Sequence, residues 1–210
     1  MTFGIVFYFK KDAIILAMDK RFFSYGRISN NEEKLIKISD KVYLALGGEK
    51  IFCKHVINIF KLFKGKNDVF GILNTVSPYI KEFCNIHQSF INKVSPPGEV
   101  HRPELFQIII AGHDKSDELK IGLLTSLQPY SFVPTEIKEG VLAIGGTYEN
   151  QVFATEEMKQ FLNKKDINLT DVKKKTMQVI KEISRVNEKV SSNGDIVIIR
   201  KDSVEQESFS

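Results

Sequence analysis

Thr2 follows Met1, so removal of Met1 would give the chain an amino-terminal threonine. A threonine hydroxyl is a weak nucleophile at neutral pH and needs a base within hydrogen-bonding distance. The free α-amine, with a reference pKa of about 7.7 to 8.0, is well suited to be that base. The reaction also needs a cation that favours the alkoxide, a carboxylate that orients this cation, and a backbone N–H that receives the oxyanion.

Lys34, Asp19 and Gly48 are the candidates for the cation, the carboxylate and the N–H donor. Asp19 directly follows the second apolar run of a predicted hairpin, whereas Lys34 precedes and Gly48 follows a second predicted hairpin. Each residue alone has a common structural explanation, as a solvated lysine, an aspartate that starts a turn or a glycine that makes one. Their order and spacing favour a shared site at one edge of a sheet.

The period of the apolar residues predicts strands and helices along the whole chain. Both faces of the early strands are apolar, which is typical of strands covered on both sides. Pro78 is expected to bend the second helix, Thr170 to cap the fourth, and the residues after about 203 to form a polar tail. The predicted strands are 3–9, 13–18, 35–38, 42–46, 105–111, 119–124, 141–144 and 195–200, and the predicted helices are 52–63, 69–94, 151–163 and 171–188.

This order of elements predicts one α+β domain over residues 1–210. Two antiparallel sheets, each apolar on both faces and flanked by a pair of helices, would form a four-layer αββα sandwich. The many apolar residues of 52–63 and 70–86 suggest that the outer helices serve either as an oligomer contact or simply as core. A length of 210 residues with 42% apolar residues suits a single core.

Composition argues against several other functions. The net charge of +4 is small and the lysines are dispersed, so nucleic-acid binding has no support. The longest apolar runs are far shorter than the roughly 20 residues of a membrane helix, and no signal peptide is indicated, so we expect a cytoplasmic protein. The spacing of Cys53, Cys84 and the four histidines suggests neither a disulfide nor a metal site. We therefore expect no cofactor and no membrane partner.

Several stretches resemble the proteasome β-subunits and the bacterial HslV peptidases, which belong to the N-terminal nucleophile (Ntn) hydrolase superfamily. Position by position, the resemblance implies that Thr2 is the nucleophile, that Asp19 and Lys34 form the charged pair beside it, and that Gly48 donates to the oxyanion. The matching stretches are Thr2, 12–21, 33–38, 45–49, 108–114, 143–146 and 195–202.

The same resemblance implies a threonine peptidase that cleaves peptides or unfolded proteins inside a homo-oligomeric ring, with an ATPase unfoldase as a further partner. Ser191 is the nearest match to the serine of the family's Asp-x-x-Ser element, although an ungapped alignment places Asn187 and Val190 there. Gly146 stands where the family usually has a serine. These two departures favour an alternative hypothesis, a catalytically silent subunit that only assembles. A third is a hydrolase of small amides.

Overall fold

The computed structural model describes residues 3–24, 27–30, 32–48, 50–94, 106–126 and 131–210. It confirms the coarse prediction of a mixed α+β fold with two antiparallel sheets. The four helices of these ranges alternate, in pairs, with groups of strands along the sequence. No helix of the described ranges is long and apolar enough to cross a bilayer.

The first sheet carries the N-terminal strand near its centre and the C-terminal strand at one edge. Its order is β10-β1-β2-β11-β12, and every neighbouring pair is antiparallel. The consecutive strands β1 and β2 form a hairpin in which Gly4 lies opposite Met18. The strands are β1 Phe3–Phe9, β2 Ala13–Asp19, β10 Val141–Gly145, β11 Gly194–Arg200 and β12 Val204–Phe209.

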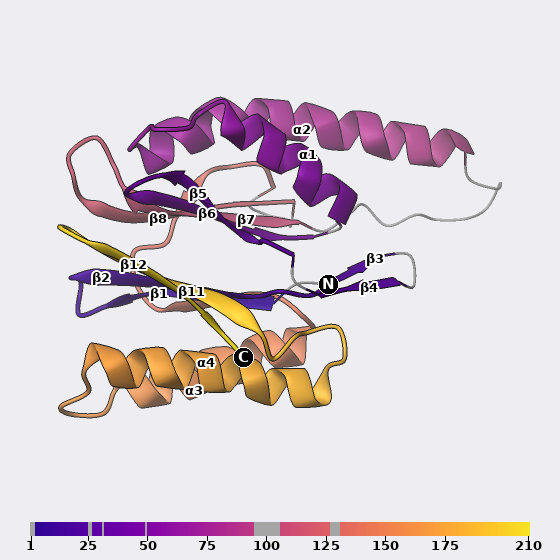
Figure 1. Cartoon of the computed structure of the whole chain (residues 1–210). Coiled ribbons are helices and arrows are strands. Elements are labelled where there is room, and N and C mark those ends of the chain that lie inside the picture. The colour runs from indigo at the N-terminus through magenta and orange to yellow at the C-terminus, as the bar shows by residue number, and fades with distance from the viewer. Residues whose placement is uncertain (1–2, 25–26, 31, 49, 95–105, 127–130) are drawn as a thin grey trace.

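The second sheet is built from the middle of the chain in sequential order, β5-β6-β7-β8-β9. A separate hairpin, β3–β4, projects beyond the sheets on the side of the molecule where the N-terminus lies (Figure 1). The remaining strands are β3 Phe22–Ser24, β4 Arg27–Ser29, β5 Leu35–Ser39, β6 Val42–Gly47, β7 Gln107–His113, β8 Leu119–Thr125 and β9 Thr135–Glu136.

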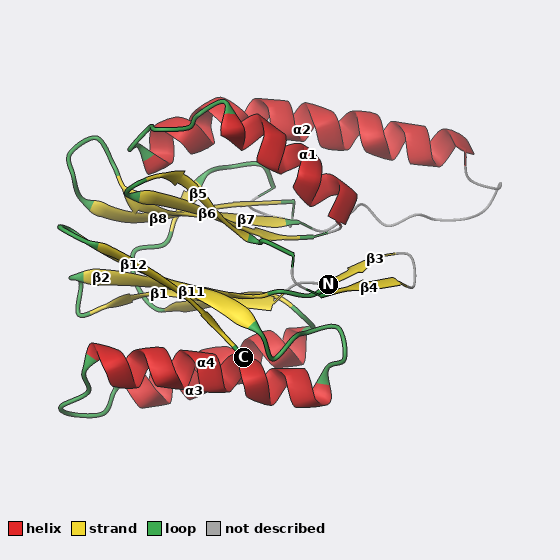
Figure 2. Ribbon diagram, viewed as in Figure 1, coloured by secondary structure: helices red, strands yellow, loops and turns green. Residues whose placement is uncertain are grey.

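Each sheet is covered by two helices on one face and faces the other sheet on its second face (Figures 1 and 2). Helices α1 (Lys50–Lys61) and α2 (Val69–Val94) lie on the second sheet, and α3 (Tyr148–Leu162) and α4 (Leu169–Val186) lie on the first. Pro78 lies within α2, which continues through it.

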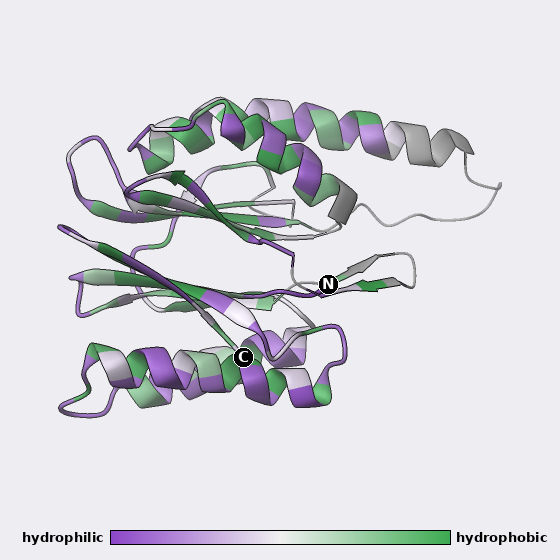
Figure 3. Ribbon diagram, viewed as in Figure 1, coloured by the Kyte–Doolittle hydropathy of each residue, from purple (hydrophilic) through white to green (hydrophobic). Residues whose placement is uncertain are grey.

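Three groups of buried apolar side chains fill the three spaces between these elements. One lies between α1, α2 and the second sheet, another between α3, α4 and the first sheet, and the third between the two sheets. Apolar and polar residues alternate along the helices, and apolar residues are frequent on the strands between them (Figure 3). The strands are apolar on both faces because each sheet contributes to two of these cores.

Most of the large apolar side chains of α1 and α2 belong to the core. Phe52, Val56 and Phe60 are buried, as are the side chains of Ile72 and Ile80. The structure therefore favours the simpler of the two explanations for these helices. Their composition alone is no argument for an oligomer contact.

Several predicted boundaries were wrong. The polar tail forms the edge strand β12, which pairs with β11 on one side and exposes most of its side chains. Helix α4 is capped by Asn168, so Thr170 lies within its first turn. Helix α3 begins at Tyr148 because Thr147 and Asn150 form a capping box ahead of the predicted start. The short strands β3, β4 and β9 were not predicted. Cys53 is buried, but Cys84 is only partly so.

Candidate active site

Asp19 is the last residue of β2 and lies at the end of the first sheet where β1 begins. Strand β2 is flanked by β1 and β11, and Gly194, the first residue of β11, pairs directly with Asp19. The side chain of Asp19 has no exposed surface. A buried carboxylate is stable only when donors surround it, so its partners define the site.

The Asp19 carboxylate accepts four hydrogen bonds. Oδ1 accepts from the backbone N–H of Phe3 and from Lys34 Nζ, each over 2.7 Å. Oδ2 accepts from the backbone N–H groups of Arg21, at 2.9 Å, and Ser191, at 3.0 Å. Three segments that are distant in the sequence are thereby joined to the end of β2.

Lys34 precedes β5 and is almost completely buried, with 1% of its side chain exposed. Its ammonium donates to Asp19 Oδ1 and to the backbone carbonyl of Arg21, and lies 4.7 Å from the centre of the Phe22 ring. An ammonium has three N–H donors. Among the described residues, the acceptors of this ammonium are the Asp19 carboxylate and the Arg21 carbonyl.

Burial lowers the pKa of Lys34 from its usual value, and the attraction and hydrogen bond of Asp19 oppose this effect. The lysine therefore gives up its proton more readily than an exposed lysine would. An ammonium whose proton is held less tightly is a better hydrogen-bond donor to a hydroxyl that is being deprotonated.

The backbone of Ser191, rather than its hydroxyl, contacts the charged pair. The residue is 4% exposed, and its N–H donates to Asp19. Its Oγ accepts from the backbone N–H of Asn193 over 3.1 Å. The structure thus brings Ser191 to the predicted site. There its hydrogen bonds to Asp19 and Asn193 hold the loop before β11 in place.

Gly48 lies at the same end of the second sheet as Lys34. Leu35 pairs with Ala45 in the β5–β6 hairpin, so Lys34 and Gly48 both lie just beyond this paired segment. Gly48 has φ 152°, a conformation that favours glycine. No hydrogen bond joins Gly48 to Asp19 or Lys34 in the described part of the chain. Thr2, the predicted nucleophile, lies outside the described residues, and Phe3 is its covalent neighbour.

The backbone and surroundings of position 146, where the resembling family has a serine, favour glycine. Gly146 follows β10 with φ +65°, in the left-handed region. A Cβ atom there would lie 2.9 Å from Cδ2 of Phe3 and 3.3 Å from the Asn150 side chain. The Phe3 ring thus occupies the space of a side chain at position 146, which accounts for this departure in physical terms.

Arg21 is a residue of the site that the sequence-based reasoning did not single out. Its guanidinium donates to the backbone carbonyls of Glu188 and Val190, the latter over 3.2 Å, and to Asn30 Oδ1 over 2.7 Å. Arg21 therefore holds the loop before Ser191 against the end of β2. Its position two residues after Asp19 was the one available signal.

Asn187 follows the last residue of α4 and caps this helix. An ungapped alignment places it at the aspartate of the Asp-x-x-Ser element. Its Nδ2 donates to Asn150 Oδ1 over 2.6 Å, and that oxygen also accepts from the backbone N–H of Thr147. Asn187 thus ties the end of α4 to the start of α3. Val190 is buried in the core beneath α3 and α4.

No family model matches the chain, and no curated protein matches it. Within the described residues, no three histidine, cysteine, aspartate or glutamate side chains are grouped as metal ligands would be. The geometry of Asp19, Lys34 and their partners is therefore the basis for a functional proposal.

Proposed function

We propose that the chain is an amide hydrolase of the Ntn type, a threonine peptidase in which Thr2 acts as nucleophile after Met1 is removed. The observation that carries this proposal is the buried Lys34–Asp19 pair, which is hydrogen-bonded to the backbone of Phe3. The pair is thus hydrogen-bonded to the residue that follows Thr2. A buried ion pair beside a threonine that can become terminal is suited to activating the threonine hydroxyl. The helix-covered pair of facing sheets supports the assignment to this superfamily.

In the proposed reaction, the free α-amine of Thr2 accepts the proton of the Thr2 hydroxyl as Oγ attacks the carbonyl carbon of an amide. The Lys34 ammonium stabilises the developing alkoxide by its positive charge, and the Gly48 N–H stabilises the oxyanion. The protonated amine then gives its proton to the leaving nitrogen as the C–N bond breaks. Water hydrolyses the resulting ester and restores the hydroxyl.

Covalent labelling of the full chain tests this proposal. After expression with an aminopeptidase that removes Met1, we expect a threonine-directed electrophile to add one adduct, which peptide mass spectrometry places on Thr2. Lys34→Met should abolish the adduct, whereas Lys20→Met, which changes a partly exposed lysine next to Asp19 that pairs with Asp195, should retain it. A processed chain that is not labelled, or a Lys34 variant that is labelled normally, would refute the mechanism.

The alternative is a catalytically silent subunit of the same architecture. It is favoured by Gly146 and by the Ser191 hydroxyl, which is engaged with Asn193 instead of facing the charged pair. Intact mass of the protein from its native source separates the two proposals. A retained Met1 blocks the amine and favours the silent subunit, whereas a mass without Met1 favours the hydrolase.

We further propose that copies of the chain assemble into a homo-oligomer, as a peptidase ring acting on peptides or unfolded proteins requires. The support is a groove between α3 and α4, lined in part by Phe153, Ile183 and Val186. Val186 is 80% exposed and Phe153 is 41% exposed, so both side chains are accessible from solvent in this groove. A separate ATPase that supplies unfolded chains belongs to the same proposal.

Sedimentation of two matched variants tests the assembly. Val186→Glu should shift the oligomer toward the monomer, because it places a charge in the apolar groove. Tyr79→Glu changes another exposed residue, at 65% exposure on α2, and should leave the assembly unchanged. Equal effects of the two variants, or a monomeric unmodified chain, would exclude this groove as the contact.

A further inference from the structure

Strand β12 carries an apolar residue at each end, Val204 and Phe209, with polar residues between them. Val204 packs against the core between the two sheets, whereas Phe209 packs against the core beneath α3 and α4. In the sheet, Phe209 lies opposite Gly194, and Gly194 lies opposite Asp19. Phe209 is therefore two strands away from the buried carboxylate, at the same end of the sheet, and residues directly opposite each other point to the same face.

The Phe209 ring packs directly on the backbone of Gly194. A Cβ atom at position 194 would lie 2.3 Å from Cζ and 2.8 Å from Cε1 of Phe209, and 2.5 Å from the Met18 carbonyl oxygen. The tip of the ring thus occupies the space that a side chain at position 194 would need. Glycine at this position lets the ring reach across β11 in the direction of β2.

Contacts on either side of Phe209 fix the end of β12. The backbone oxygen of Ser210 accepts from Lys181 Nζ of α4. On the other side, Ser208 Oγ donates to Asp195 Oδ1 over 2.6 Å. The chain before Phe209 is thus tied to β11 and the chain after it to α4, which keeps the ring seated on Gly194.

A series of hydrogen bonds connects the start of β11 to the Asp19 carboxylate. The Lys20 N–H donates to the Asn193 carbonyl over 3.0 Å, and the Asn193 N–H donates to Ser191 Oγ over 3.1 Å. The Ser191 N–H in turn donates to Asp19 Oδ2 over 3.0 Å. Because Asn193 directly precedes Gly194, a shift at the start of β11 acts on the N–H group that holds Asp19.

We propose that Phe209 is a positioning residue of the candidate active site. Its ring holds the start of β11 against the end of β2, and the preceding loop thereby presents the Ser191 N–H to the Asp19 carboxylate. Asp19 in turn orients the Lys34 ammonium. The role of Phe209 in catalysis rests on the proposed hydrolase function, whereas its effect on Ser191 and Asp19 does not.

Amide hydrogen exchange, followed by NMR in the full chain, tests this role without any catalysis. Phe209→Ala removes the ring from Gly194, so the loop before β11 should open more often. We expect the Ser191 N–H to exchange about tenfold faster than in the unmodified chain. An unchanged exchange rate at Ser191 would overturn the proposal.

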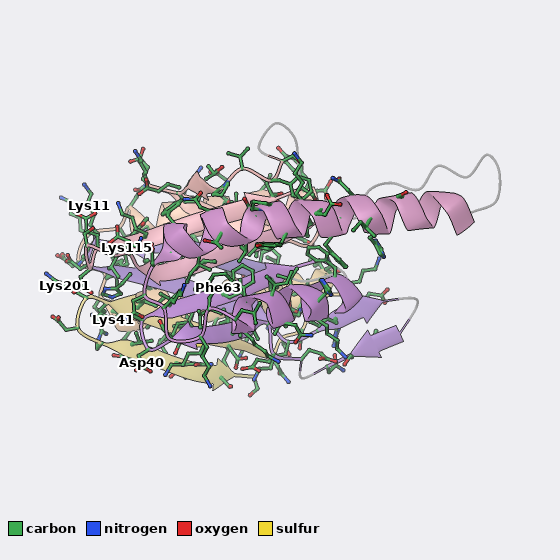
Figure 4. All side chains as sticks on the ribbon, turned by 90° about the horizontal axis from the view of Figure 1, so that it is seen from above. Lys11, Asp40, Lys41, Phe63, Lys115 and Lys201 are labelled. Atoms are coloured by element: carbon green, nitrogen blue, oxygen red, sulfur yellow. The ribbon has the colours of Figure 1, made fainter. Side chains whose placement is uncertain are left out.

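Val204→Ala is the control, because it shortens the apolar side chain at the other end of the same strand. The turn before Val204 contains Lys201, which lies at the same end of the molecule as Lys11 of the β1–β2 turn (Figure 4). This end is opposite the start of β1, so exchange at Ser191 should stay unchanged in the control. Equal acceleration in the two variants would mean that β12 only adds general stability, and would overturn the proposal.

A graded variant adds a second test. Phe209→Leu keeps a shorter apolar side chain over Gly194, so Ser191 should exchange faster than in the unmodified chain but slower than in Phe209→Ala. If the alanine variant does not fold, the leucine variant decides, and normal exchange at Ser191 in it would overturn the proposal. Labelling of Thr2 in the processed chain should slow in the same order. The expected order of exchange without labelling of any form would support the role of Phe209 and refute the hydrolase.

Discussion

Phe3 and Lys34 donate hydrogen bonds to the same oxygen atom, Oδ1 of Asp19, each over 2.7 Å. One acceptor therefore fixes both the backbone next to Thr2 and the ammonium proposed to act on its hydroxyl. Because the carboxylate is entirely buried, solvent does not weaken these two hydrogen bonds to Oδ1. Because both groups bond to this oxygen, the fold itself fixes where the Lys34 ammonium lies relative to the start of β1.

Replacement of Lys34 by methionine should destabilise the fold as well as remove activity. The change leaves the Asp19 charge buried without its ion-pair partner, and breaking a buried pair in this way costs about 3 to 5 kcal/mol. Urea unfolding measures the loss. Asp19→Asn combined with Lys34→Met should be destabilised by less than the sum of the two single variants. Strict additivity would show that the pair does not contribute as a unit.

The lowered pKa of Lys34 predicts how stability changes with pH. Between this folded-state pKa and the ordinary value of 10.5, the unfolded chain binds the proton that the folded chain has released. Unfolding then takes up a proton, so the free energy of unfolding should rise with pH in this window. Urea unfolding of the unmodified chain, compared with Lys34→Met at each pH, isolates the effect. A difference that is constant with pH would contradict it.

The parts of the site that could be predicted were those set by local sequence. Asp19 and Lys34 each adjoin an apolar run of clear period, so their positions at strand ends followed from the predicted hairpins. The approach of Ser191 to Asp19 depends on the pairing of β11 with β2, and the two residues are 172 positions apart in the sequence. Such pairing leaves no local pattern, and the resemblance alone pointed to Ser191.

The strand β12 and the residue Arg21 were missed because their places also depend on contacts with distant parts of the sequence. Val204–Phe209 contains mainly polar residues, as is common in edge strands such as β12, where charged side chains disfavour pairing with other chains. In the sequence, nothing distinguishes Arg21 from an ordinary surface arginine. Its role arises because the carbonyls of Glu188 and Val190 converge on it from the end of α4.

Tyr8 provides a polar contact between the sheets, and its removal should be measurable. Its hydroxyl donates to the Leu119 carbonyl over 3.2 Å and accepts from the Ile121 N–H over 3.0 Å. Tyr8→Phe leaves two backbone groups of β8 without this partner, so the free energy of unfolding should fall by about 1 to 3 kcal/mol. Tyr43→Phe is the control, since this buried residue makes no comparable hydroxyl contact among the described residues. Equal losses in both would mean that the bridge is not stabilising.

Gly146 offers a test of whether the fold can accept the serine that the resembling family carries. Any L-residue at φ +65° incurs about 1 to 2 kcal/mol of backbone strain, and a Cβ would also lie 2.9 Å from Phe3 Cδ2. Gly140 is the matched control, because it has φ +85° and a Cβ there would meet no atom within 4 Å. We therefore expect Gly146→Ser to lower the free energy of unfolding by more than Gly140→Ser. Since Phe3 is hydrogen-bonded to Asp19, displacement of its ring should also reduce labelling of Thr2. A Gly146 variant that is as stable as its control and is labelled faster would instead show that the missing hydroxyl limits activity.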